Sequence, residues 1–427
     1  MKILFFLIIP FVSFSQFSLT YADKKIPTIA YYKDEISIPV DSVNDIVNDL
    51  WNKHINEQKK DLTRKHEIDK SYVEIDGVRM NFSLSRKGKK PSEGYPLYIA
   101  LHGGGGAPGN VNDEQWEHMK YYYLNSIDTG IYIAPRGISN NWNLHFEHLS
   151  YPLYDRIIDN LILNNEINPN KIFILGFSAG GDGVYQIAPR MADRLAGANM
   201  SAGHPNGTSA VNLFTVPFMI QMGENDTAYD RNKEAAVYHL KLEFLRSKQN
   251  KGYINELFLH DNGTHNSPWR DNNPNPSEYA VITNAKEWYN GLDKKLKKKD
   301  SNAVRCLNKF TRTPHPNHLI WESNTRANSR GLKAISHYWL SSTNPKGTIE
   351  VSFENNTFTI HQSDEDFTIW IDPKLVDISK KVIIINNSKE IYNQLVAPNI
   401  NSIAKSIMMK NDPELIYIAE IPIKINN

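Results

Sequence analysis

Six short apolar runs between residues 98 and 259 constrain the fold of this chain more than any other feature. They lack the alternation of apolar and polar residues that a half-solvated strand shows, so each suits a strand buried on both faces. Helix-like segments separate most of them, which predicts a mostly parallel sheet with helices on both faces. The runs are Tyr98–Leu101, Ile131–Ala134, Ile172–Leu175, Ala198–Met200, Phe218–Met222 and Glu256–Leu259, and the helical segments are Tyr154–Leu163, Gly183–Met191, Asn232–Arg246 and Glu278–Leu296.

The length of 427 residues favours a second, smaller unit beside this sheet. From about Phe310 the pattern changes to short β segments with turn residues such as Asn355-Asn356 between them, which predicts an all-β, sandwich-like region. The expected organisation is a helical extension at 16–70, an α/β domain at 71–297 and a β-rich accessory domain at 305–427. The β segments are His318–Glu322, Ala334–Leu340, Thr348–Glu354, Thr357–His361, Thr368–Ile371, Lys381–Ile385 and Leu415–Ile421.

Two smaller patterns border the α/β domain. Before it, five apolar residues recur at helical spacing, and two short strands are expected at Tyr72–Ile75 and Arg79–Leu84. After it, five lysines between 294 and 299 are interpreted as the solvated end of a helix that runs into a linker. The amphipathic residues are Val43, Ile46, Val47, Leu50 and Trp51.

The first fifteen residues are typical of a secretion signal. Lys2 gives a positive start, Ile3 to Val12 an apolar core, and Ser13-Phe14-Ser15 a small-residue cleavage pattern. The apolar core is too short to span a bilayer, and no cysteine follows it that would carry a lipid anchor. The sequence therefore predicts a secreted or periplasmic bacterial protein without a membrane anchor.

Composition excludes several partners. The formal net charge of +1 leaves no electrostatic footprint for nucleic acid. Cys306 is the only cysteine, so neither an intramolecular disulfide nor a thiolate metal cluster can form. The histidines follow no zinc-binding spacing. We therefore expect no metal and no organic cofactor.

The run Ile172–Leu175 continues directly into Gly176-Phe177-Ser178-Ala179-Gly180. A serine on a sharp strand-to-helix turn needs small neighbours because the backbone there is cramped. The turn would raise the Ser178 hydroxyl above the sheet edge, with the N-terminus of the next helix behind it. Ser178 is the candidate nucleophile, and the backbone N–H of Ala179 is a candidate donor to an oxyanion.

Three further motifs follow other apolar runs, in the chain order that a serine nucleophile on such a sheet requires. Gly103 and Gly104, in a run of four glycines after His102, would supply a second oxyanion donor. Asp226 follows Phe218–Met222 and would orient a histidine, with Glu224 and Asp230 as alternatives. His265, after Asn262-Gly263-Thr264, would act as general base, with His260 as its competitor.

These motifs together resemble the secreted α/β-hydrolase superfamily, over residues 95–295. Among its members, the chain is most similar to esterases grouped with feruloyl esterases, acetylxylan esterases and poly(3-hydroxybutyrate) depolymerases. The resemblance implies an α/β-hydrolase fold, nucleophile, acid and base roles for Ser178, Asp226 and His265, and oxyanion donors at Ala179 and the Gly103–Gly104 region. Thr311–Pro314 and His337–Leu340 resemble β tails appended to some bacterial members.

The substrate is expected among the loops that follow the strands. Trp142 and Trp269 would offer aromatic faces, and Arg136 and His204 lie in two further loops. By analogy, an exported hydrolase with a β accessory domain suggests acetyl or feruloyl esters on polysaccharides. Two alternatives stay open: a serine peptidase of the prolyl-oligopeptidase type, and a non-catalytic binding protein on a hydrolase scaffold.

Overall fold

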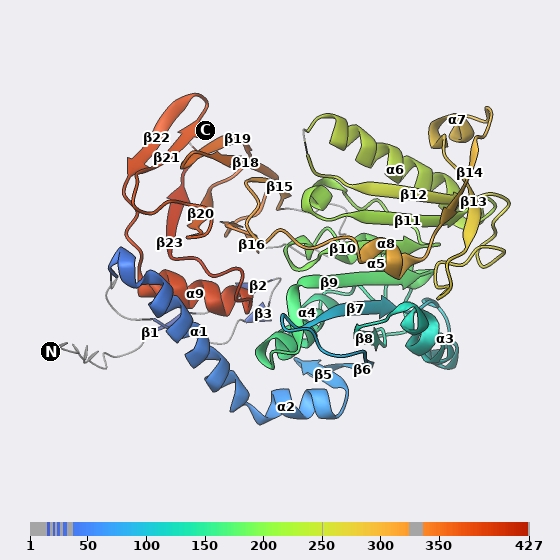
Figure 1. The fold of residues 1–427 in the computed structure, drawn as a ribbon, viewed down its shortest axis with the longest axis horizontal. Helices are drawn as coiled ribbons and strands as arrows, with labels where there is room; N and C mark the ends of the chain where they lie inside the picture. Colours follow the sequence, from blue (N-terminus) through green and yellow to red (C-terminus); the bar gives the residue numbers. More distant parts are fainter. Residues whose placement is uncertain are drawn as a thin grey trace.

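The computed structural model describes residues 37–249, 251–323 and 336–425, together with the backbone of four short strands before residue 37. Its centre is a ten-stranded sheet in the order β14-β13-β12-β11-β10-β9-β7-β8-β6-β5. The six strands from β8 to β12 in this order pair in parallel, and antiparallel strands extend both ends (Figure 1). The predicted α/β fold is confirmed, and all six apolar runs lie in these parallel strands. The strands are β5 Tyr72–Ile75, β6 Val78–Lys87, β7 Tyr95–Leu101, β8 Gly130–Pro135, β9 Ile167–Phe177, β10 Gly197–Ser201, β11 Phe218–Gly223, β12 Asn255–His260, β13 Glu278–Ile282 and β14 Leu296–Asp300.

Helices bury both faces of this sheet. Successive residues of β7 alternate between the faces: Leu97 and Ile99 belong to the apolar core that α4, α5 and α6 complete, and Tyr98 to the core that α3 and α8 complete. Because both faces are covered, the parallel strands carry apolar side chains at almost every position. The helices are α3 Gly109–Tyr122, α4 Ser150–Leu163, α5 Ala179–Ile187, α6 Arg231–Ser247 and α8 Ala303–Leu307.

The helix predicted at Glu278–Leu296 is wrong. This segment forms β13, the short helix α7 (Ala285–Tyr289) and β14, which together extend the sheet antiparallel beyond β12. Gly291, in the left-handed region at φ 71°, lies in the turn between α7 and β14. The lysines at 297–299 therefore lie on an edge strand and not at a helix end, and such charges discourage further strand pairing there.

The C-terminal region holds two smaller sheets, of five and four strands, around a core of its own. Five of its seven predicted β segments are confirmed as strands, and Asn355 and Asn356 turn the β18–β19 hairpin with positive φ angles. The segment Leu415–Ile421 becomes a strand only from Ala419, Ala334–Leu340 is strand only at 336–337 and Leu340 among its described residues, and β22 was not predicted. The all-β prediction missed the helix α9 (Ile400–Lys410), whose Ile400, Ile403 and Ile407 are buried at helical spacing. The strands are β15 His318–Glu322, β16 Ser336–His337, β17 Leu340–Ser341, β18 Thr348–Glu354, β19 Thr357–Ser363, β20 Phe367–Ile371, β21 Val382–Asn386, β22 Lys389–Gln394 and β23 Ala419–Ile423.

The amphipathic helix predicted near the N-terminus is α1 (Val43–Lys59), followed by α2 (Leu62–Asp69). All five of its predicted apolar residues pack in the C-terminal core, so α1 completes a core built mainly from residues that follow position 318. In Figure 1, α1 lies beside α9. The predicted signal peptide at 1–15 lies outside the described residues, apart from the backbone of Ser15 in β1. The remaining short strands are β1 Ser15–Phe17, β2 Thr20–Tyr21, β3 Lys24–Lys25 and β4 Ile29–Tyr31.

A buried ionic seam joins the C-terminal region to the large sheet. Arg312 pairs with Asp412 at 2.8 Å, and both side chains are wholly buried. Lys410, at the end of α9, pairs with Asp193 at 2.6 Å, and Arg194 contacts Asp412 at 3.8 Å. Asp193 and Arg194 precede β10, so the seam lies at the amino ends of the parallel strands.

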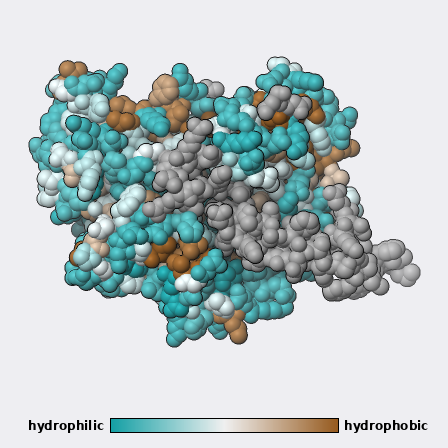
Figure 2. All heavy atoms as spheres, turned by 180° about the vertical axis from the view of Figure 1, so that it is seen from behind, coloured by the Kyte–Doolittle hydropathy of each residue, from teal (hydrophilic) through white to brown (hydrophobic). Residues whose placement is uncertain are grey.

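The surface is mainly polar. Seen from behind, hydrophilic residues dominate the coloured area, and the apolar ones form small separate patches (Figure 2). None of the helices in the described residues is long and apolar enough to cross a membrane.

Candidate functional site

Ser178 stands alone between the end of β9 and the start of α5, in a strained backbone conformation (φ 59°, ψ −121°). Its neighbours must be small: a Cβ at Gly176 would lie 2.2 Å from the carbonyl oxygen of Gly180, and one at Gly180 would lie 2.0 Å from that of Leu101. The Ser178 N–H donates to the Ser201 carbonyl of β10 at 2.9 Å. The turn is therefore fixed from both neighbouring strands, and its strain is of the kind that functional sites retain.

The structure brings Ser178, His265 and Asp226 together from three loops at the carboxyl ends of β9, β12 and β11. His265 Nε2 lies 3.1 Å from Ser178 Oγ, and His265 Nδ1 lies 2.7 Å from Asp226 Oδ2. Asp226 is nearly buried, whereas 32% of the His265 side chain is exposed. With Nδ1–H donating to the carboxylate, Nε2 is left to accept the serine proton.

The two loops that carry the acid and the histidine are tied to each other. The Asn225 N–H donates to the Gly263 carbonyl at 2.6 Å, and the Glu224 N–H donates to the His260 carbonyl at 3.0 Å. A Cβ at Gly223 would lie only 2.3 Å from the Thr264 carbonyl oxygen, so this close approach requires glycine. The separation of Asp226 and His265 is therefore set by backbone contacts.

The alternative acids and base have other partners. His260 is buried, stacks on Trp269 at 4.5 Å and contacts Gln221 Oε1, and burial lowers its pKa to about 3. Glu224 accepts from Lys294 at 3.1 Å and from the Trp288 indole. Asp230 is exposed and lies 3.7 Å from Lys233. His265 and Asp226 alone of these candidates line up with Ser178.

The glycine-rich loop lies against the serine turn. A Cβ at Gly103 would lie 3.4 Å from Ser178 Cβ, and one at Gly105 would lie 3.2 Å from Ala179 Cβ. The Gly105 N–H donates to Asn112 Oδ1. These contacts bring the glycine loop against Ala179, the first residue of α5. The backbone N–H groups of Gly104 and Ala179 remain the candidate oxyanion donors.

Two buried histidines hold this loop. His102 Nδ1 donates to the Gly103 carbonyl at 2.6 Å, the Gly137 N–H donates to His102 Nε2, and His145 Nε2 donates to the His102 carbonyl at 2.8 Å. Burial lowers the pKa of His102 to about 4 and that of His145 well below its ordinary value. Both rings are therefore neutral, as these donor and acceptor roles require.

The four residues predicted to bind substrate fall into two groups. Trp142 is half exposed next to the glycine loop, since a Cβ at Gly106 would lie 3.8 Å from Trp142 Cβ, and the partly buried His204 lies near the Ser178 helix, where its N–H donates to Asp182. Trp269 is only 2% exposed and Arg136 is engaged by Asp113, Asn140 and two carbonyls. The prediction is wrong for this second pair, because neither presents a free face or a free charge to a substrate.

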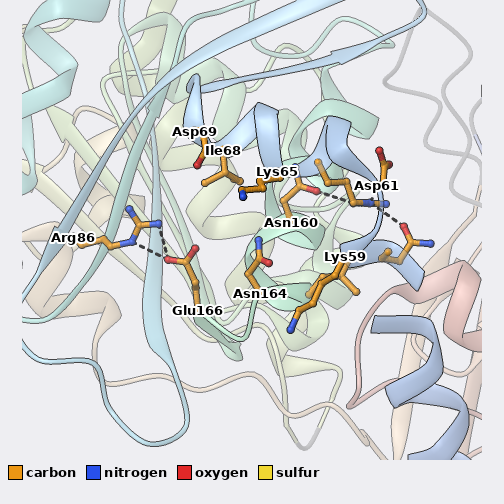
Figure 3. Close-up of a pocket in the computed structure, with 12 residues that line it drawn as sticks. Lys59, Asp61, Lys65, Ile68, Asp69, Arg86, Asn160, Asn164 and Glu166 are labelled. Atoms are coloured by element: carbon orange, nitrogen blue, oxygen red, sulfur yellow. Dashed lines mark hydrogen bonds and ion pairs between the residues drawn. The ribbon is translucent and has the colours of Figure 1, made fainter. Parts of the chain in front are cut away.

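A cavity of about 300 Å³ lies elsewhere, between α2, the end of α4 and β6 (Figure 3). Some of its charges are matched within the protein: Arg86 pairs with Glu166, and Arg64 lies 3.9 Å from Asp61 and donates to Asn160. Glu166 precedes β9, so the cavity lies at the edge of the sheet opposite Ser178. Among the described residues, no three His, Cys, Asp or Glu side chains are placed to hold a metal ion.

The sequence interpretation missed Arg231, the first residue of α6. Its Nη1 lies 3.6 Å from Asp226 Oδ1, the carboxylate oxygen that does not contact His265. The only sequence signal was its position five residues after Asp226, because the contact depends on how the intervening loop turns.

No family model and no curated protein matches this chain. Solved structures with partial likeness include the BES protein from Bacillus cereus, with 13% identity over 45% of this chain and 86% of that chain and a TM-score of 0.35. A thermostable esterase has 17% identity over 57% and 64% (TM-score 0.38), and Est1E from Butyrivibrio proteoclasticus 17% over 45% and 89% (TM-score 0.32). At these scores the likeness bears on neither substrate nor mechanism.

Proposed function

We propose that this protein is a serine hydrolase that cleaves carboxylic esters through an acyl-enzyme. The observation that carries the proposal is the unbroken path from the Ser178 hydroxyl through His265 to Asp226, at 3.1 and 2.7 Å. A hydroxyl, an imidazole and a buried carboxylate in this order make serine nucleophilic near neutral pH.

In the proposed reaction, His265 Nε2 takes the Ser178 proton while Oγ attacks the ester carbonyl. The N–H groups of Ala179 and Gly104 stabilise the oxyanion, and the imidazolium then donates its proton to the leaving alcohol. Water, deprotonated by the same nitrogen, attacks the acyl-enzyme and releases the acid with Ser178 restored. Asp226 keeps Nδ1 protonated throughout and stabilises the imidazolium.

A fluorophosphonate probe tests whether Ser178 is activated. We expect labelling of the wild type, loss of labelling in Ser178→Ala, and strong reduction in His265→Ala. Ser201→Ala is a control for the probe, because the Ser201 hydroxyl is buried against Asp271 one strand away. An unlabelled wild type would contradict the proposal and favour a binding protein on this scaffold.

The bond cleaved is tested by comparing p-nitrophenyl acyl esters with peptide p-nitroanilides. We expect rapid ester cleavage and little amidase activity, whereas the reverse ranking would favour the peptidase alternative. For the natural substrate we propose acyl esters on polysaccharides, with the exposed face of Trp142 stacking on a sugar or an aromatic acid. Release of acetate or ferulate from acylated xylan, measured against synthetic esters, tests this finer point.

A further inference from the structure

A buried cation contacts the acid of the proposed catalytic site. Arg231 Nη1 lies 3.6 Å from Asp226 Oδ1, and only 16% of the Arg231 side chain is exposed. A charge in such a position is weakly screened, so it acts on neighbouring groups far more than a surface charge does.

The chain adopts an unfavourable conformation to place this guanidinium. Tyr229 (φ 57°) and Asp230 (φ 55°) both lie in the left-handed region immediately before Arg231, although neither is glycine. The reversal lets α6 begin beneath Asp226, whose carbonyl accepts the Asn232 N–H at 3.1 Å. The Tyr229 ring covers the guanidinium, with 5.0 Å between Cζ and the ring centroid. Such strain persists where the surroundings hold a residue for a purpose.

Arg231 also lies close to the nucleophile helix. Burial raises the pKa of Asp182 in α5, while the His204 N–H, Asn206 and the charge of Arg231 act in the opposite direction. Asp182 in turn donates its N–H to the Ser178 carbonyl. Arg231 therefore contacts the carboxylate behind His265 and acts electrostatically on a carboxylate in the helix of Ser178.

The other charged groups around this site are engaged with partners of their own. Since each is already neutralised or hydrogen-bonded locally, Arg231 is the cation whose charge is directed at Asp226. Glu224 and Asp261 form ion pairs with Lys294, and Asp230 forms one with Lys233. Asp271 is hydrogen-bonded to Tyr122, Tyr123 and Ser201, and His204 to Asn206.

We propose that Arg231 is a positioning residue that sets the lower pH limit of the activity through its contact with Asp226. The inference rests on the proposed function, in which His265 accepts the serine proton while Asp226 holds Nδ1. A positive charge beside Asp226 offsets part of the carboxylate's attraction for the imidazolium. Without Arg231, activity is expected to begin at higher pH.

The test measures the rate of fluorophosphonate labelling of Ser178 between pH 4 and 9 in the wild type, Arg231→Gln and Arg231→Lys. We expect Arg231→Gln to move the midpoint of the acid limb upward by about 0.5 to 1 pH unit, and Arg231→Lys to restore most of the wild-type profile. The matched control is Lys233→Gln, which removes a 60%-exposed cation two residues along the same helix and is expected to leave the midpoint in place.

The outcomes separate the inference from the function on which it rests. A wild type that is not labelled at any pH contradicts both. A labelled wild type whose midpoint is unchanged in Arg231→Gln, or displaced equally in Arg231→Lys, overturns the role of Arg231 and leaves the proposed function standing. A loss of rate without a change of midpoint likewise overturns it, since that is what a purely structural contact would give.

Discussion

Charged groups lie in different environments at the carboxyl ends and at the amino ends of the parallel strands, here called the carboxyl edge and the amino edge of the sheet. At the carboxyl edge, His265 is one-third exposed and bridges Ser178 and a buried carboxylate. At the amino edge, the charges of the seam are buried and matched, as in the wholly buried pair of Arg312 and Asp412. At the carboxyl edge His265 is placed to transfer a proton, whereas the charges of the seam are engaged with one another.

The difference follows from what surrounds each carboxylate. Burial alone would raise the pKa of Asp193 in the seam, but the charge of Lys410 overrides it and lowers the pKa to about 2. Burial lowers the pKa of Lys410 itself, while the facing Asp193 acts in the opposite direction, and the two buried groups hold their elements together. At the other edge the partner of Asp226 is the imidazole of His265, whose second nitrogen contacts the Ser178 hydroxyl. The comparison therefore predicts that substitutions at one edge remove activity and at the other remove stability.

The largest effect is expected at the carboxyl edge. Asp226→Asn should lower kcat by about 10⁴-fold, because an amide stabilises the wrong histidine tautomer, while the cost in the free energy of unfolding, from the lost contact with Arg231 at 3.6 Å, should be smaller than at the seam. Ester turnover and urea denaturation measure the two quantities. Asp230→Asn, four residues on and exposed, is the control and should retain full turnover. An Asp226→Asn variant that is strongly destabilised but keeps the wild-type turnover per folded molecule would contradict this prediction.

The seam should respond in stability alone. Arg312→Met leaves Asp412 buried without its nearest cation and should cost about 3 to 5 kcal/mol in the free energy of unfolding. The double variant Arg312→Met/Asp412→Leu should recover much of this loss, because no charge is then stranded. Urea denaturation measures both, with turnover per folded molecule unchanged. A stable Arg312→Met that has lost turnover would show that the two edges are coupled.

Within the C-terminal region, one group should make stability depend on pH. Burial alone would lower the pKa of His315, but Asp372 and Glu414 raise it to about 9. Because the folded-state pKa exceeds that of the unfolded chain, the stabilisation is complete below about pH 6.5 and is lost as pH rises toward 9. The loss should be on the order of 2 kcal/mol. Urea denaturation at pH 6 and 9.5 should show this difference in the wild type and not in His315→Gln, and equal differences would contradict it.

The smallest effect concerns the rim of the proposed site. Trp142→Ala should raise KM for an aromatic or sugar ester about three- to ten-fold with kcat unchanged, the loss expected for one stacking face. Methyl or ethyl acetate, which offers nothing to stack on, is the control substrate and should show no change. An equal change in KM for both substrates would assign Trp142 to holding the glycine loop.

Much of the fold and of the candidate site could be predicted from local sequence. A strand buried on both faces has no polar alternation, so the six runs identified the parallel strands directly. Glycine is required at 176 and 180 because a Cβ there would lie within about 2.2 Å of a backbone carbonyl oxygen, and this requirement appears in the sequence as a motif. Glu278–Leu296 was misread because a short helix between two antiparallel strands at the end of the sheet has the composition of one longer helix. The roles of Trp269 and Arg136 were misread because burial and pairing are not local properties.

What the sequence by itself determined is the order of the parallel strands and the candidates Ser178, Asp226 and His265, because unbroken apolar runs and the residues that follow them are local features. Only the tertiary structure decided between His260 and His265, placed Arg231 against Asp226, and joined α1 to the C-terminal core. Each of these depends on distances between residues far apart in the chain, or on how one loop turns. Such distances arise from packing, and no local pattern encodes them.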